Sequence, residues 1–118
     1  MARPNLTIAT ETCVTKIITE RLTHSTDPDI THKAVGVELA KSASGPRYRV
    51  NANREVLCCA GAIKTPQILT LSGIGPKDEL KRLGITVVKA LDAVGKNLYD
   101  VGLFFSQMGR CILTLVST

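Results

Sequence analysis

The first half of the chain alternates hydrophobic and polar residues, which is the pattern of strands that bury one face against a core. Four stretches carry the alternation: residues 5–10, 13–19, 34–40 and 47–50. Polar, turn-rich stretches at 24–33 and 42–46 separate the later ones. Successive strands of this kind predict an antiparallel β-meander.

The pattern changes after residue 55. The run Val56-Leu57-Cys58-Cys59-Ala60 is continuously hydrophobic, which is typical of a strand covered on both faces. Beyond the following Gly61, Thr65 suits a helix N-cap and Pro66 the first helical position, where a missing N–H costs nothing. We therefore expect a helix from this point to the pair Ser72-Gly73.

A second short helix is expected over residues 76–83. Pro76 opens it, acidic residues follow in its first turn, basic residues lie in its last turn, and Gly84 suits its end. Residues 85–88 read as one more strand. The predicted fold class is mixed α/β, a β-meander plus one buried strand–helix unit.

Composition limits the classes of function. A chain of 118 residues that is 44% hydrophobic and 21% charged is expected to fold as one compact domain. Its net charge of +5 is spread singly, with Lys81-Arg82 as the one adjacent basic pair in the sequence, so we expect no nucleic-acid interface. Gln107 and Arg110 interrupt the apolar stretch 101–118, so we expect no membrane helix.

The candidate chemistry lies where the expected buried strand meets the expected helix. At the end of an α/β strand, a glycine lets the main chain approach a ligand closely, and helix N–H groups favour phosphate. Ala60, Gly61 and Ala62 are therefore candidate contacts to a nucleotide cofactor. A tight strand-to-helix turn without a ligand is the alternative interpretation, and both stay open at this point.

Residues 61–75, GAIKTPQILTLSGIG, resemble the second signature of the glucose–methanol–choline (GMC) oxidoreductases. These are FAD-dependent enzymes that oxidise alcohols, and the likeness is strongest to aryl-alcohol-oxidase-type members. Supporting similarity is found at residues 3–7, 14–17, 34–38 and 95–100. The resemblance covers about residues 3–100 and implies part of a Rossmann-like FAD-binding domain.

The resemblance also implies roles for single residues. In the family, the valine that matches Val14 meets the FAD adenine through its main chain, and the pair that matches Ala60 and Gly61 lies near the nucleotide half. The family's GxGxxG pyrophosphate loop has no counterpart here. His24 and His32 do not match the catalytic histidine motif, so no catalytic residue is assigned. A metal site formed by these histidines with neighbouring aspartates is less favoured than a solvated loop.

These expectations describe an internal piece of a larger enzyme. Residues 1–100 would be a partial FAD-binding domain, and residues 101–118 a tail that does not match the family and is not native to it. Alone, the chain is expected to bind FAD weakly or not at all and to turn over no alcohol. Its exposed apolar edges are expected to associate with other copies or proteins.

The family resemblance is compatible with a secreted parent protein, and Met1–Asn5 carries no signal sequence. The alternative function is a non-enzymatic module that binds polypeptides through exposed sheet edges.

Overall fold

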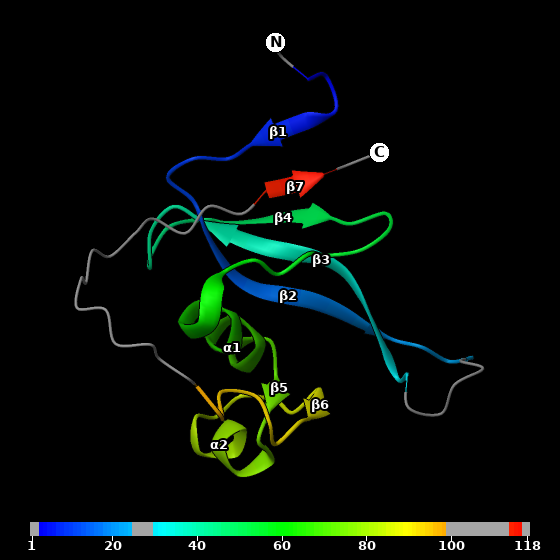
Figure 1. The fold of residues 1–118 in the computed structure, drawn as a ribbon, viewed down its shortest axis with the longest axis vertical. Coiled ribbons are helices and arrows are strands. Elements are labelled where there is room, and N and C mark those ends of the chain that lie inside the picture. The colour runs from blue at the N-terminus through cyan, green and yellow to red at the C-terminus, as the bar shows by residue number, and fades with distance from the viewer. Residues whose placement is uncertain (1–2, 25–29, 99–113, 117–118) are drawn as a thin grey trace.

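The computed structural model describes residues 3–24, 30–98 and 114–116. Its main sheet contains three antiparallel strands in the order β2 (Cys13–Arg21), β3 (His32–Ala40) and β4 (Arg47–Asn51). Ile17 of β2 lies opposite Val37, and Leu39 of β3 lies opposite Tyr48. The meander predicted from the alternation is confirmed for its last three strands, with β2 and β4 at the edges (Figure 1), whereas the first predicted stretch, residues 5–10, contributes no strand to this sheet.

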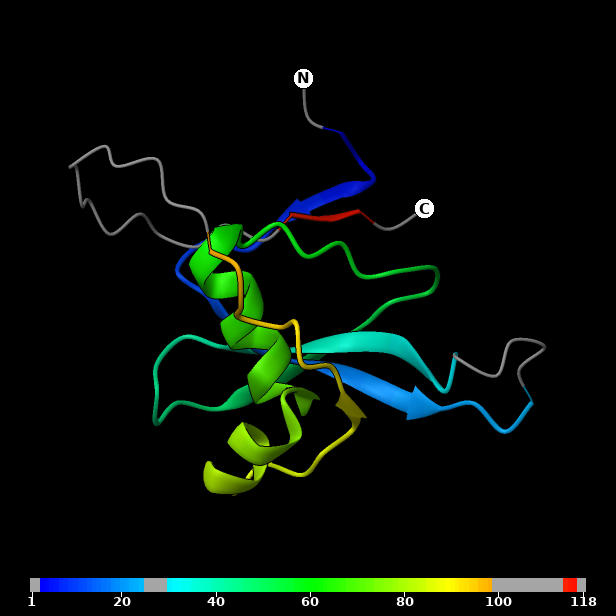
Figure 2. The ribbon, with the colours of Figure 1, turned by 60° about the horizontal axis from the view of Figure 1, so that its bottom comes forward.

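A helix and a small terminal unit lie beside this sheet. Helix α1 (Gly61–Leu71) packs against β2, and β5 (Ile74–Gly75), α2 (Lys77–Arg82) and β6 (Lys89–Ala90) follow beyond it (Figures 1 and 2). Strands β5 and β6 run parallel, whereas β1 (Leu6–Ile8) pairs antiparallel with β7 (Thr114–Val116). Together with the sheet, these elements confirm the mixed α/β fold class.

The hydrophobic core of the described residues is small. It consists of Val37, Leu39 and Ala40 on the central strand β3, Ile68 on α1 and Leu80 on α2. Strand β3 supplies most of it because it has a neighbour on each side, whereas the edge strands lie half-buried or exposed. Helix α1 therefore covers the sheet at β2, and the described residues of the edge strands stay half-buried or exposed.

The connection from α1 into the small unit is built by Ser72 and Gly73, the pair at which the sequence predicted the end of the helix. The buried Ser72 ends α1 and hydrogen-bonds to β2. Gly73 has a φ of +80°, and its main-chain carbonyl accepts hydrogen bonds from Val88 and Lys89. The loop thus links α1, β2 and the small unit through main-chain and side-chain hydrogen bonds.

The predicted buried strand at residues 56–60 is wrong. This segment forms no strand, Leu57 is 57% exposed, and Cys59 is exposed. A hydrophobic run becomes a buried strand only when strands flank it on both sides, and none of the described strands pairs with it. The side chains therefore alternate between half-buried and exposed along an extended chain.

Two further boundaries differ from the sequence prediction. Helix α1 begins at Gly61 and not at Pro66, so the proline lies inside the helix and leaves the Ala62 carbonyl without its usual donor. The last predicted strand, 85–88, is irregular, and the pairing with β5 falls instead on Lys89–Ala90. The second helix and its closing glycine are confirmed. Among the described residues, no helix has the length and apolar character to cross a membrane.

Candidate functional site

The first part of the candidate site is the turn into α1. Gly61 has a φ of +80°, a left-handed conformation that turns the extended chain into the helix. A Cβ placed there would meet nothing within 4 Å. No side chain caps this end of the helix, and its first turn holds no acidic residue. Free main-chain N–H groups beside an open space are a geometry that suits a phosphate or another anionic group.

The second part is the main chain of β2 around Val14. Val14 pairs with Leu39 and Lys16 pairs with Glu38, so Thr15 is an extra residue without a partner, which makes a β-bulge. Because β2 is an edge strand, main-chain groups on its outer side are free of strand partners. This edge provides the N–H and C=O pair that main-chain recognition of an adenine edge requires.

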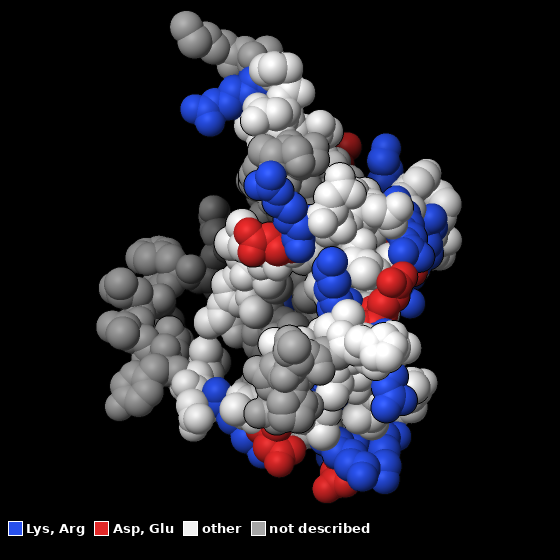
Figure 3. Space-filling model, turned by 90° about the vertical axis from the view of Figure 1, so that its right-hand side faces the viewer, with Lys and Arg blue, Asp and Glu red and all other residues white. Residues whose placement is uncertain are grey.

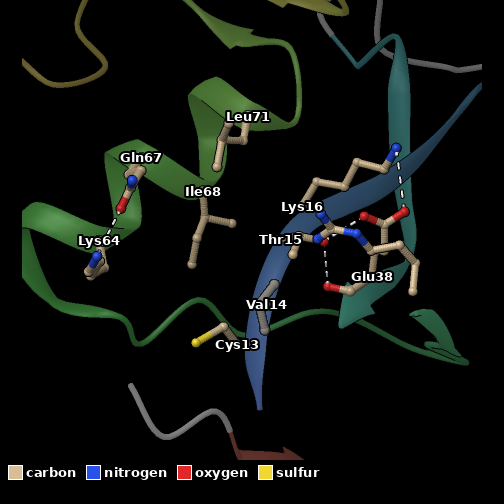
Figure 4. Close-up of a pocket in the computed structure, with 10 residues that line it drawn as sticks. Cys13, Val14, Thr15, Lys16, Glu38, Lys64, Gln67, Ile68 and Leu71 are labelled. Atoms are coloured by element: carbon tan, nitrogen blue, oxygen red, sulfur yellow. Dashed lines mark hydrogen bonds and ion pairs between the residues drawn. The ribbon is translucent and has the colours of Figure 1, made fainter. Parts of the chain in front are cut away.

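A cavity of about 610 Å³ lies between this edge and α1. In Figure 4, Ile68 projects from α1 toward the stretch of β2 that carries Cys13 and Val14. The volume of the cavity falls within the range of about 300–1,000 Å³ that is common for small-molecule sites. Ten residues line it: Cys13, Val14, Thr15, Lys16, Glu38, Arg47, Lys64, Gln67, Ile68 and Leu71.

The polar wall of the cavity is predominantly positive. Lys16 forms an ion pair with Glu38 at 3.7 Å between Nζ and Oε2. Lys64 Nζ donates a hydrogen bond to Gln67 Oε1 at 3.2 Å, and an Arg47 guanidinium N–H donates one to the Ala43 carbonyl at 3.0 Å. Three cationic side chains against one carboxylate favour an anionic ligand in this region.

Glu38 is held in its ionised form. The hydrogen bond from the Thr15 hydroxyl lowers the pKa of Glu38 below its ordinary value of 4.5, and the charges of Lys16 and Arg47 act in the same direction. Partial burial acts against them and is outweighed. The carboxylate is therefore available as a stable hydrogen-bond acceptor for the bulge.

The structure places the residues selected from the sequence in two regions. Val14 lines the cavity, whereas Ala60, Gly61 and Ala62 form the start of α1 and lie outside the cavity lining. Sequence reasoning missed the polar wall, of which Lys16, Glu38 and Lys64 are the main members. A possible signal was the alternation of β2 and β3 together, because it places Lys16 and Glu38 on one face once the register is known.

A metal site at the histidines finds no support in the described residues. These residues hold no group of three or more His, Cys, Asp or Glu side chains that could bind a metal ion. His24 is exposed, and His32 begins β3, where its Nδ1 lies 2.9 Å from the Thr31 hydroxyl. The aspartates of the same loop, Asp27 and Asp29, fall outside the described residues.

Surface charge follows the scattered pattern of the sequence. On the face shown in Figure 3, Lys and Arg side chains lie in several separate groups, with Asp and Glu among them. Nucleic-acid interfaces instead gather basic residues on one face. The absence of a nucleic-acid partner remains a prediction that this arrangement favours.

Comparison with known proteins shows which family this sequence matches. A family model described as GMC oxidoreductase matches residues 1–101. Human mitochondrial choline dehydrogenase is 43% identical over 100 residues, covering 85% of this chain and 15% of that protein. The oxygen-dependent choline dehydrogenase of Pectobacterium carotovorum subsp. carotovorum is 48% identical over 98 residues, covering 83% of this chain and 15% of that protein.

A solved structure agrees with these matches. An FAD-dependent oxidoreductase from Chaetomium thermophilum superposes with a TM-score of 0.53 at 35% identity, covering 69% of this chain and 12% of that one. The chain thus spans about 15% of the length of the curated relatives named above. The resemblance predicted from residues 61–75 is confirmed at the level of family and cofactor class. The two curated relatives named here are choline dehydrogenases, whereas the sequence had pointed to aryl-alcohol-oxidase-type members.

Proposed function

This chain belongs to the GMC oxidoreductase family, and on that premise we propose that it forms part of the site for the nucleotide half of FAD in an enzyme that oxidises the CH–OH group of a small alcohol. The observation that carries the proposal is the open, left-handed turn at Gly61, which leads directly into the uncapped helix α1. FAD in the family is supported both by the family match and by the FAD-dependent structural neighbour.

Four residues are proposed to hold the cofactor. The main chain of Val14 on the bulged edge of β2 would meet the adenine, and Ala60, Gly61 and Ala62 would lie against the nucleotide where a larger side chain would intrude. Bound at these residues, FAD would supply the hydride acceptor for oxidation of the alcohol carbon. The residues of this chain bind and orient the cofactor in this proposal, and none is assigned to take the alcohol proton.

The substrate class follows from the relatives. The two curated relatives named above are choline dehydrogenases, so we propose that the parent enzyme acts on a small alcohol of this kind. The isolated chain is proposed to be inactive because its sequence holds no GxGxxG loop for the pyrophosphate and neither histidine matches the family's catalytic motif. Residues 1–100 are proposed to be a partial FAD-binding domain.

The tail is proposed to have a different origin. Residues 101–118 depart from the family pattern, and residues 99–113 and 117–118 fall outside the described part of the chain. We attribute this stretch to translated intron or a misjoined gene model. Sequencing the transcript tests the idea, because an abundant mRNA that reads without interruption through codons 99–118 would contradict it.

The geometry does not favour a polypeptide-binding module. The outer edge strand β4 exposes Arg47 and Arg49, and charged side chains on an edge strand oppose pairing with another strand. Strand β2, the other edge, is covered in part by α1. Purification with a specific protein partner and without flavin would revive that alternative.

Binding of ADP to isotope-labelled protein tests the proposed site. ADP carries the adenine, ribose and pyrophosphate of the FAD nucleotide half, and NMR detects weak binding. We expect the amide signals of Val14 and Gly61 to shift together as ADP is added. Gly61→Ala should abolish the shifts because its Cβ enters the open space.

Gly84→Ala is the matched control. Gly84 also has a positive φ and open space around its Cβ position, so the backbone cost is similar while the site is untouched. The absence of any shift at Val14 and Gly61 in the wild-type chain would contradict the proposed site. Retention of stoichiometric FAD, seen as flavin absorbance of the purified chain, would contradict the proposal that binding is weak.

A further inference from the structure

The bulge next to Val14 is held by a side chain from the neighbouring strand. The Thr15 hydroxyl donates a hydrogen bond to Glu38 Oε1 at 2.6 Å and lies 3.2 Å from the Glu38 main-chain oxygen (Figure 4). The same carboxylate is paired with Lys16, the residue on the other side of the bulge. Thr15, which forms the bulge, and Lys16, which follows it, are thereby both attached to Glu38 of β3.

Such an attachment has a specific consequence for the main chain. A bulged residue has no partner in the strand ladder, so the ladder alone does not fix its conformation or that of the residue before it. A slip of one residue would turn every following side chain to the opposite face. The charge-assisted hydrogen bond from Thr15 to Glu38 selects one arrangement, and charge-assisted bonds of this length are stronger than neutral ones.

We propose that Thr15 is a positioning residue that acts through Glu38 to hold the main chain of Val14 toward the cofactor site. The inference rests on the function proposed above, in which that main chain meets the adenine. Thr15 itself need not touch the ligand. Its hydroxyl makes its hydrogen bond to Glu38 in β3, and the bulge transmits the constraint to Val14, its immediate neighbour.

Three variants isolate the hydroxyl. Thr15→Val keeps the branched shape of the side chain and removes the hydrogen bond, whereas Thr15→Ser keeps the hydroxyl. Thr19→Val makes the same change on the same strand, at a threonine whose hydroxyl makes no hydrogen bond within the part of the chain that the structure describes. Each variant is titrated with ADP, and the Val14 amide and carbonyl chemical shifts are recorded before ADP is added.

We expect Thr15→Val to weaken ADP binding by about fivefold, the effect of one hydrogen bond, and to change the Val14 shifts in the ligand-free chain. Thr15→Ser and Thr19→Val should match the wild type in both readouts. Unchanged Val14 shifts and unchanged affinity in Thr15→Val would overturn the role of Thr15 while leaving the proposed site intact. A wild-type chain that does not respond to ADP would instead overturn the site, and the inference with it.

A second variant covers the case in which Thr15→Val does not fold. Glu38→Leu removes the same hydrogen bond from the side of β3, and the same two readouts apply to it. Loss of the folded spectrum in both variants would show that the pair is required by the fold itself, which would overturn the assignment as a positioning pair.

Discussion

The side chain of Ser72 accepts a hydrogen bond from the main-chain N–H of Ile17, 55 residues earlier in the chain, at 2.7 Å. The same hydroxyl donates to the Ile68 carbonyl at 2.6 Å, within the last turn of α1. Ile17 lies on the edge strand β2, where outward N–H groups have no strand partner. One buried hydroxyl thus satisfies an edge amide and fixes the end of α1 against the sheet.

Replacement of this serine is expected to loosen α1 from the sheet. Ser72 is 7% exposed, so Ser72→Ala leaves the Ile17 N–H without an acceptor in a partly buried position. We expect the free energy of unfolding to fall by about 1–3 kcal/mol, measured by urea denaturation, with faster hydrogen exchange of the Ile17 amide. Ser44→Ala, in an exposed turn, should change neither, and equal effects of the two variants would contradict the interpretation.

The elements that the sequence predicted correctly depend on local pattern. Strands β2, β3 and β4 follow from alternation and from the turn-forming residues between them, and α2 follows from Pro76 and Gly84 at its ends. These signals act within a few residues of each other, so one sequence suffices to detect them. Gly61 was also expected at a turn, and it has the positive φ and open surroundings that such a turn uses, while its contact with a cofactor stays a prediction.

The features that were missed depend on contacts between distant segments. The run 56–60 was assigned as a buried strand because its composition matches one, yet burial needs neighbouring strands that the described residues do not supply. The bulge at Thr15 depends on the register between β2 and β3, which single-strand alternation does not determine. The polar wall of the cavity, with Lys64 on α1, appears only when the helix is placed against β2.

Gly73 and Gly84 separate backbone strain from steric clash. Both have a positive φ, +80° and +68°. A Cβ at Gly73 would collide with the Thr86 carbonyl oxygen, whereas one at Gly84 would meet nothing within 4 Å. We expect Gly84→Ala to cost about 1–2 kcal/mol, and Gly73→Ala to cost about 1–3 kcal/mol more, both measured by urea denaturation. Equal losses would show that the loop around Gly73 can move away from the new methyl group.

Stability is expected to depend on the ionisation of Glu38. Because the folded chain lowers the pKa of this group below 4.5, its contribution is present above about pH 4.5 and is lost as the pH falls through the lowered folded value. The difference in free energy of unfolding between wild type and Glu38→Gln should therefore shrink as the pH is lowered from about 7 to 3. When both proteins also carry Thr15→Val, the difference in free energy of unfolding should be smaller, because that substitution removes the largest cause of the lowered Glu38 pKa. A difference that stays constant over this range would contradict the interpretation.

The exposed apolar surface beside the candidate site is expected to drive self-association. Ile63 is 72% exposed on the first turn of α1, and Leu57 is 57% exposed on the segment before it. Contact between copies would bury these side chains, and burial of one isoleucine contributes about 1.5–3 kcal/mol. Ile63→Glu removes that surface and also places a negative charge near the positive end of the helix, which stabilises it.

Sedimentation velocity at several concentrations measures the effect, and we expect the dissociation constant for self-association to rise by about tenfold or more in Ile63→Glu. Gln67→Glu is the control, because it adds the same charge on an exposed position of the same helix without removing apolar surface. Equal weakening in both variants would mean that charge repulsion suffices to separate the copies. Since only contact through the apolar surface predicts a larger effect at Ile63, the comparison between the two variants decides whether this surface is the one that associates.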